Sequence, residues 1–143
     1  MTMAEENSNY NSKYHILIVD DDKFMVDMYS TKFAESGFQV EVALDGEEAL
    51  EKLSGGLRPD IFLIDVIMPK LDGFQLVQKL KEQKLDQQAA IIVLSNLGQQ
   101  DDLDKSLGLG VDGYIIKASA TPTEVVKRTI EIADVKLKRI TNP

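Results

Sequence analysis

Three aspartates stand in a row directly after a short apolar run, and another aspartate ends a second run of this kind. The two segments read "ILIVDDD" at residues 16–22 and "DIFLID" at residues 60–65. Carboxylate oxygens that gather without histidine or cysteine suit a hard cation, Mg²⁺ or Mn²⁺ rather than Zn²⁺. Magnesium bound in this way keeps water ligands and commonly takes phosphate oxygens as well. We therefore expect metal-dependent phosphoryl chemistry around Asp20, Asp21 and Asp65.

A hydroxyl group and an ammonium group end two further apolar runs. Ser95 closes "AAIIVLS" and Lys117 closes "GYIIK". Both side chains are natural partners for phosphate oxygens that lie beside a metal ion. Asp65 is the best candidate for a nucleophile that forms an acyl phosphate, because it stands alone at the end of its run and a rigid turn, "MPKLDG" at residues 68–73, follows it.

Short apolar runs alternate with longer amphipathic segments, a pattern that predicts a parallel sheet with helices on both faces. The expected strands are residues 15–19, 38–43, 60–65, 89–95 and 113–117. The second strand alternates between polar and apolar residues and is expected at an edge. Ligands of such sheets bind beyond the carboxyl ends of the strands, where the acidic, hydroxyl and ammonium groups all fall.

Helix starts are marked by capping residues. Asp22, Asp45 and Asp72 each precede an amphipathic segment, and "TPTE" at residues 121–124 has the form of a capping box with proline at the first helical position. The last helix is expected to reach about Ile140.

Composition limits the classes of protein that this chain can represent. It has 143 residues, a net charge of −8 and no cysteine. The length fits one domain, which we place at residues 14–140 behind a disordered tail at residues 1–13. The acidic balance argues against direct nucleic-acid binding. A signal peptide and a membrane span are both missing from the sequence, so we expect a cytoplasmic protein that does not contact the membrane.

Four segments in the same order carry a resemblance to a known family. The segments "ILIVDDD", "DIFLIDVIMPKLDGFQL", "IIVLS" and "LGLGVDGYIIK" resemble the response-regulator receiver domain of two-component signalling, a CheY-like domain, over residues 15–136. The resemblance implies a flavodoxin-like α/β fold, a (βα)5 three-layer sandwich whose five-stranded parallel sheet has the order 2-1-3-4-5.

The resemblance also implies a metal site and a phosphate donor. Asp65 would accept a phosphoryl group from a sensor histidine kinase or a histidine phosphotransfer protein. Asp21, Asp65 and the backbone carbonyl of Ile67 would bind Mg²⁺, or Mn²⁺, directly, and Asp20 would bind it through water. Such a domain is a signalling switch that catalyses only its own phosphorylation and dephosphorylation.

The same resemblance implies an output face. Ser95 and Lys117 would hold the phosphoryl group, and Tyr114 would be an aromatic switch that turns inward when Ser95 moves. An output protein would bind the face made by the fourth helix, the fifth strand and the fifth helix. Apolar residues near heptad spacing follow the last helix, and we expect them to be core at its start and an interface with a second copy, as a homodimer, or with a partner at its end: Val126, Ala133, Leu137 and Ile140. The chain could be a single-domain regulator or a receiver excised from a longer protein.

The chain departs from the family pattern at one position, and two other functions are alternatives to a phosphorylation switch. Receivers usually have proline after the lysine, but here Ala118 follows Lys117, so we expect a trans peptide bond and a different loop. A Mg²⁺-dependent phosphatase with an aspartate nucleophile commonly has a second acid two residues further on, where this chain has Ile67. An interaction module that no longer takes phosphate is the other alternative.

The "GLGVDG" run at residues 108–113 precedes a strand rather than following one, so it does not predict a dinucleotide site.

Overall fold

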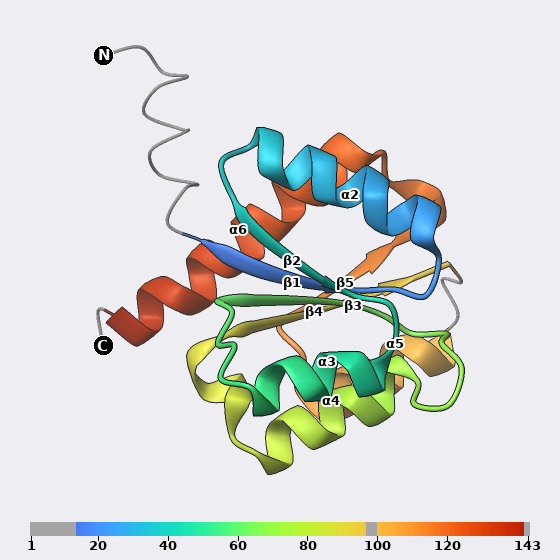
Figure 1. Ribbon diagram of the computed structural model, residues 1–143, viewed down its shortest axis with the longest axis vertical. Coiled ribbons are helices and arrows are strands. Elements are labelled where there is room, and N and C mark those ends of the chain that lie inside the picture. The colour runs from blue at the N-terminus through green and yellow to red at the C-terminus, as the bar shows by residue number, and fades with distance from the viewer. Residues whose placement is uncertain (1–13, 97–99, 142–143) are drawn as a thin grey trace.

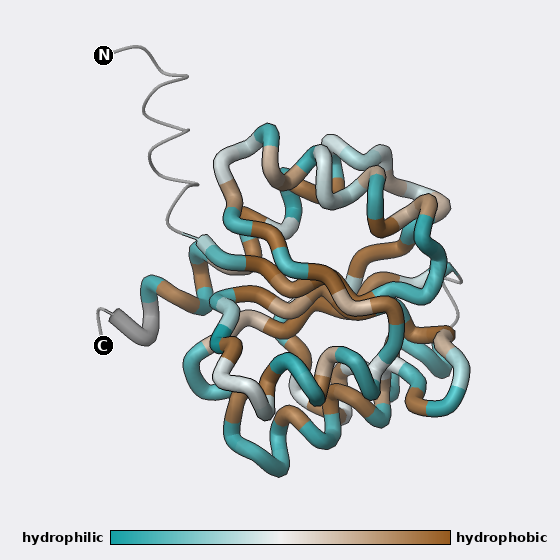
Figure 2. The backbone as a smooth tube through the Cα atoms, viewed as in Figure 1, coloured by the Kyte–Doolittle hydropathy of each residue, from teal (hydrophilic) through white to brown (hydrophobic). Residues whose placement is uncertain are grey.

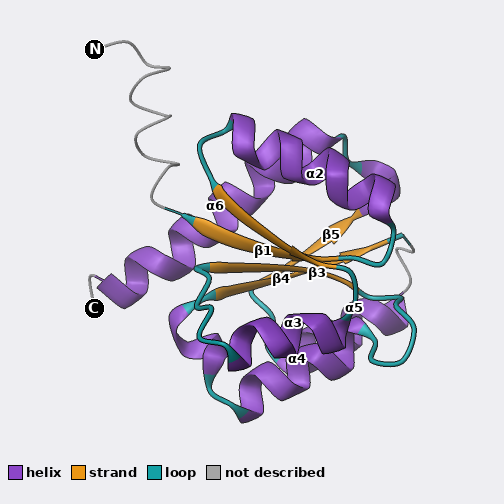
Figure 3. Ribbon diagram, in the orientation of Figure 1, coloured by secondary structure: helices purple, strands orange, loops and turns teal. Residues whose placement is uncertain are grey.

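The sheet has the predicted order and direction of strands. The computed structural model describes residues 14–96 and 100–141, with side chains described as far as Lys138. Five parallel strands pair in the order β2-β1-β3-β4-β5, which confirms the flavodoxin-like topology (Figures 1 and 3). Their bounds are β1 His15–Val19, β2 Gln39–Ala43, β3 Ile61–Asp65, β4 Ala90–Ser95 and β5 Gly113–Ile116.

Helices cover both faces of this sheet and make three layers. Their bounds are α2 Lys23–Glu35, α3 Gly46–Ser54, α4 Gly73–Glu82, α5 Gln100–Leu109 and α6 Pro122–Thr141, with short 3-10 helices η1 Leu85–Gln88 and η2 Lys117–Ser119. Helices α2 and α6 lie on one face, and α3, α4 and α5 lie on the other (Figure 1). Two separate apolar clusters fill the two spaces between the sheet and the helices.

Burial along each strand follows its place in the sheet. Every residue of β3 and β4 is buried, and β1 is buried from Ile16 onward, because helices cover both faces of the central strands. Strand β2 lies at an edge, as its alternating pattern predicted, and only Ala43 of this strand is fully buried. Figure 2 shows hydrophobic residues along the strands and hydrophilic residues on the outer turns of the helices.

The predicted helix starts are confirmed by their capping contacts. Asp22 accepts hydrogen bonds from the backbone N–H groups of Phe24, at 3.0 Å, and Met25, at 3.3 Å, and so caps α2. The Thr121 hydroxyl accepts from the Glu124 N–H at 3.2 Å, and the Glu124 carboxylate accepts in return from the Thr121 N–H at 3.3 Å. Since α2 follows the first aspartates directly, its cap also fixes the backbone beside them.

The differences from the sequence predictions are small and local. Strands β2, β3 and β4 each begin one residue later than predicted, and β5 ends at Ile116 because Lys117 begins η2. The peptide bond between Lys117 and Ala118 is trans, as expected, and the described part of the chain has no cis bond. The predicted tail at residues 1–13 lies outside the described residues. Among the helices that are described, none is long and apolar enough to cross a membrane.

Candidate functional site

Three carboxylates meet where the central strands end. Asp20 and Asp21 follow β1, and Asp65 is the last residue of β3, the strand that pairs with β1. One carboxylate oxygen from each lies within 4.8 Å of the others, a grouping that could hold a metal ion. Asp20 and Asp65 are buried, with 1% and 6% exposure, whereas Asp21 is exposed. A cation bound here would therefore be reached from the solvent side of Asp21.

Lys117 joins two of these acids. Its Nζ lies 2.7 Å from Asp20 Oδ2 and 3.0 Å from Asp65 Oδ1, and its side chain is only 6% exposed. The other oxygen of Asp20 accepts a hydrogen bond from the Asp22 N–H at 3.0 Å. Both oxygens of Asp20 are thus engaged by the protein. The three carboxylates and one ammonium leave a net charge of −2, which a divalent cation would neutralise.

The electrostatics of this cluster shift two pKa values. Burial, and next the negative charge of Asp20, raise the pKa of Asp65 from 3.8 to about 6, although Lys117 opposes the shift. Burial alone would lower the pKa of Lys117, but its hydrogen bonds and its attraction to Asp20 and Asp65 raise that pKa above its usual value. The ammonium group therefore stays charged, and burial is the main reason why the Asp65 carboxylate is costly to ionise.

An open hollow of about 370 Å³ leads to the carboxylates. Its lining residues are Asp20, Asp21, Asp22, Met25, Asp65, Ile67, Asn96 and Lys117. Met25 was not predicted as a site residue, although its place in the first turn of α2, directly after the aspartates, could have indicated it. The position of Asn96 next to Ser95 already places it at the site from the sequence. Ile67 is 59% exposed, so the mouth of the hollow has an apolar side.

Ser95 and Tyr114 lie at the neighbouring strands, but neither lines this hollow. Ser95 ends β4 with 1% exposure, in the strand that pairs with β3. Tyr114 lies in β5, partly buried, and packs against the apolar cluster beneath α3 and α4. Its backbone carbonyl accepts a hydrogen bond from Arg128 of α6 at 3.3 Å. Ser95 is thus at the carboxyl end of its strand, one strand away from Asp65, whereas Tyr114 lies two strands away and pairs with Val93 of β4.

The start of α4 packs directly against the end of β3. The Gly73 N–H donates to the Val66 carbonyl at 2.8 Å. A Cβ atom on Gly73 would lie 2.3 Å from the Asp65 carbonyl oxygen, so only glycine allows this approach. In the turn that leads to this helix, Lys70 has a φ of 68°, a left-handed conformation that is strained for a residue with a side chain. The "MPKLDG" segment therefore sets the position of the Asp65 backbone.

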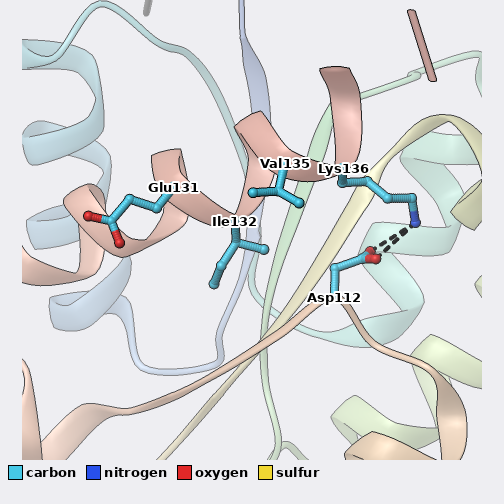
Figure 4. Close-up of a pocket in the computed structure, with 5 residues that line it drawn as sticks. All are labelled: Asp112, Glu131, Ile132, Val135 and Lys136. Atoms are coloured by element: carbon cyan, nitrogen blue, oxygen red, sulfur yellow. Dashed lines mark hydrogen bonds and ion pairs between the residues drawn. The ribbon is translucent and has the colours of Figure 1, made fainter. Parts of the chain in front are cut away.

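A second hollow, of about 450 Å³, lies along α6 far from the carboxylates. Figure 4 shows Ile132 and Val135 between Glu131 at one end and the Asp112–Lys136 pair at the other. Lys136 Nζ lies 3.0 Å from Asp112 Oδ1, and Val135 is 55% exposed. Its lining holds two acids and one lysine, and Asp112 and Lys136 pair with each other.

Comparison with known proteins identifies the family. The model of the response regulator receiver domain matches residues 16–129. Response regulator SaeR of Staphylococcus epidermidis is 41% identical over 115 residues, which are 80% of this chain and 48% of that protein. SaeR of Staphylococcus aureus is 38% identical over 114 residues, with the same shares of the two chains. The chain spans about half the length of these curated relatives.

Solved structures show the same architecture. Chemotaxis protein CheY4 of Vibrio cholerae superimposes with a TM-score of 0.77 at 28% identity, covering 83% of this chain and 98% of that one. The receiver domain of the Francisella response regulator 1452 gives a TM-score of 0.76 at 33% identity, covering 85% and 98%. With most of its length matched by the family model and by these relatives, the chain belongs to the response regulator receiver domains of two-component systems.

Proposed function

We propose that this chain is a phospho-acceptor switch that takes a phosphoryl group onto Asp65 in a reaction dependent on Mg²⁺ or Mn²⁺. The donor is a sensor histidine kinase or a histidine phosphotransfer protein. One observation carries the proposal: Asp65 is buried at the base of an open hollow, where it shares the Lys117 ammonium with Asp20 beside the exposed Asp21. This arrangement combines a carboxylate nucleophile with groups that offset phosphoryl charge.

The proposed metal ligands are those that the family resemblance implies, and the grouping of the three carboxylates supports them. Asp21 and Asp65 would bind the cation directly, together with the backbone carbonyl of Ile67. Asp20 binds through water, because its two oxygens already accept from Lys117 and from the Asp22 N–H. The Asp21 side chain is exposed, and its carboxylate accepts no hydrogen bond from another described residue. It can therefore turn toward the ion. Oxygen donors without nitrogen or sulfur fit Mg²⁺.

Phosphoryl transfer uses the Asp65 carboxylate as the nucleophile. One oxygen of Asp65 forms the bond to phosphorus while the nitrogen–phosphorus bond of the donor breaks, and the released imidazole takes up a proton. Lys117 is already 3.0 Å from Asp65 and is placed to bind an oxygen of the incoming group, with the Ser95 hydroxyl on the neighbouring strand. When bound, Mg²⁺ offsets negative charge on the transferring group. The chemistry is confined to the protein's own phosphorylation and dephosphorylation.

The signal leaves through the face made by α5, β5 and α6. Ser95 moves toward the phosphoryl group, Tyr114 turns inward, and an output protein or a second copy of the chain recognises the change. The first part of the stripe predicted on α6 is core, as expected: Val126 and Ala133 are buried, and Leu137 packs against the same cluster. The side chain of Ile140 lies outside the described residues. Among the described side chains of this helix, Val135 is an exposed apolar one, and it lies beside the hollow in Figure 4.

Incubation with acetyl phosphate tests the proposed reaction. We expect intact-protein mass spectrometry to show one added phosphoryl group in the presence of Mg²⁺ and none after chelation. Asp65→Asn should abolish the addition, whereas Asp27→Asn, the same charge change at an exposed position of α2, should not. A folded wild-type protein that takes no phosphate would support a pure interaction module instead. Continuous turnover of a phosphoester substrate would support a phosphatase.

A separate measurement tests the output face. Sedimentation velocity with and without beryllofluoride should show a change of association state, or binding of an added partner, only in the activated form. Val135→Asp should remove that change and leave phosphorylation of Asp65 intact. If the protein stays monomeric in both states, dimerisation is excluded and the face serves a different protein.

A further inference from the structure

A third hollow lies at the opposite end of the sheet from the carboxylate cluster. It has a volume of about 330 Å³ and is formed by the loop before β3 and the turn between α4 and η1. These segments lie at the amino ends of the strands, whereas Asp65 lies at the carboxyl ends (Figure 1). Phosphorylation of Asp65 therefore does not use this hollow. Its volume is at the lower end of the range for small-molecule sites.

Two cations without acidic partners line this hollow. Arg58 and Lys84 are both exposed, and within the described residues neither of them forms an ion pair. Arg58 and Lys84 thus bring two positive charges to one cavity of a chain whose net charge is −8. Asp60 is the acid that also lines the hollow, but its Oδ2 already accepts from the His15 N–H at 2.8 Å.

The guanidinium of Arg58 is held in place by the protein. Its Nη1 donates to the Leu53 carbonyl at 2.8 Å and to the Leu57 carbonyl at 2.7 Å. These bonds use one nitrogen, and no contact within the described residues engages Nε or Nη2. A guanidinium that is fixed at one nitrogen offers its remaining N–H groups to a carboxylate or phosphate with little loss of rotamer entropy.

The remaining walls are mainly apolar, and one side is conformationally constrained. Pro59 and Phe62 are buried, Leu85 is partly buried, and Gln88 adds one amide group. Lys84 has a φ of 60° because it directly follows Gln83, the C-cap of α4, at a position where helices commonly end in the left-handed conformation. The end of α4 thus fixes the backbone on this side of the hollow.

We propose that this hollow binds a small organic anion, with its carboxylate or phosphate group on Arg58 and Lys84 and a compact apolar body against Pro59, Phe62 and Leu85. The site is separate from the proposed phosphorylation of Asp65 and does not depend on it. A charged group at the rim and an apolar floor together select amphiphilic anions over inorganic ones and over neutral molecules of the same shape.

Titration of ¹⁵N-labelled protein with benzoate and with phenyl phosphate tests the proposal, and benzyl alcohol is the neutral comparison. The titrations are done without divalent cations, so that no probe binds through the carboxylate cluster. We expect saturable shifts of the amide signals of residues 57–62 and 84–88 with the two anions and weaker binding of benzyl alcohol. The anion that binds with the lower Kd shows whether the site prefers a carboxylate or a phosphate.

Three charge-removing variants complete the experiment. Arg58→Gln and Lys84→Gln should each weaken binding of the anions about tenfold, as expected for the loss of a charge-assisted hydrogen bond. Lys79→Gln makes the same charge change at an exposed position of α4 outside the hollow and should leave binding unchanged. Lys84→Gln keeps the test valid if Arg58→Gln does not fold. Shifts that do not saturate, equal binding in all three variants, or benzyl alcohol binding as tightly as benzoate would each overturn the proposal.

Discussion

Replacing Asp65 with asparagine is expected to stabilise the protein in the absence of metal. The Asp65 carboxylate is 8% exposed and shares one ammonium group with Asp20, so its charge is poorly compensated. Burial and the charge of Asp20 raise its pKa from 3.8 to about 6. An acid whose pKa is higher in the folded state than in the unfolded state destabilises the fold once it is ionised in both states.

The size and the pH dependence of this effect follow from the shift. A shift of roughly two units corresponds to about 3 kcal/mol, with the attraction of Lys117 already included. The native state binds the extra proton between the two pKa values, so the stability of the wild type falls as pH rises from about 4 to about 6 and then stays level. Asparagine removes this fall, and its amide oxygen can still accept from Lys117.

Urea denaturation followed by circular dichroism measures the gain. With a typical slope of about 2 kcal/mol per molar urea, the midpoint of Asp65→Asn should lie about 1.5 M above the wild type near pH 7.5. Near pH 5 the difference should shrink to about half, and saturating Mg²⁺ should reduce it near pH 7.5 by stabilising the wild type. Asp27→Asn should change stability by less than about 0.5 kcal/mol. An Asp65→Asn variant that is no more stable than the wild type, or a gain independent of pH, would refute the electrostatic reasoning.

Three further outcomes are expected. Asp21→Ala should strongly weaken Mg²⁺ binding in calorimetric titration, whereas Asp22→Ala should retain it and lose about 1 kcal/mol of stability with the helix cap; the reverse pattern would mean that the assignment is wrong by one residue. Lys70→Gly should raise the urea midpoint by the equivalent of about 1 kcal/mol by relieving its left-handed backbone, and an unchanged midpoint would show that the turn carries no strain. Gly73→Ala should cost more than about 2 kcal/mol and weaken Mg²⁺ binding, because its Cβ would meet the Asp65 carbonyl; Gly108→Ala, at a helix position with open space, is the control and should not destabilise.

The architecture was accessible from the sequence because its determinants are local and repeated. Alternating apolar runs predicted the strands, and parallel strands bring their carboxyl ends to one edge, so Asp20, Asp65 and Lys117 could be expected near one another. The contact between Lys117 and Asp20 joins residues 97 positions apart. No periodic pattern encodes which acid the ammonium contacts, and that depends on side-chain packing.

Other details depend on tertiary contacts that a single segment does not reveal. Strand β5 stops at Ile116 because that residue is the last to pair with β4, and Lys117 turns away into η2. Val135 is exposed while Ala133 is buried, although both are small apolar residues on one helix, because only one of them faces the sheet. Met25 packs against the core cluster beneath α2 and α6, and its position in the first turn of α2 also makes it part of the lining of the hollow.

The shared ammonium of Lys117 makes the end of β3 and the start of η2 respond to the same charge. Lys117 divides its attraction between Asp20 and Asp65, so neutralising either acid strengthens its hold on the other. Because Lys117 is the first residue of η2, which leads through Thr121 into α6, such a redistribution acts on the segment from which the last helix begins. A change of charge at Asp65, the last residue of β3, therefore changes the attraction on Lys117, the residue that joins β5 to the segment before α6.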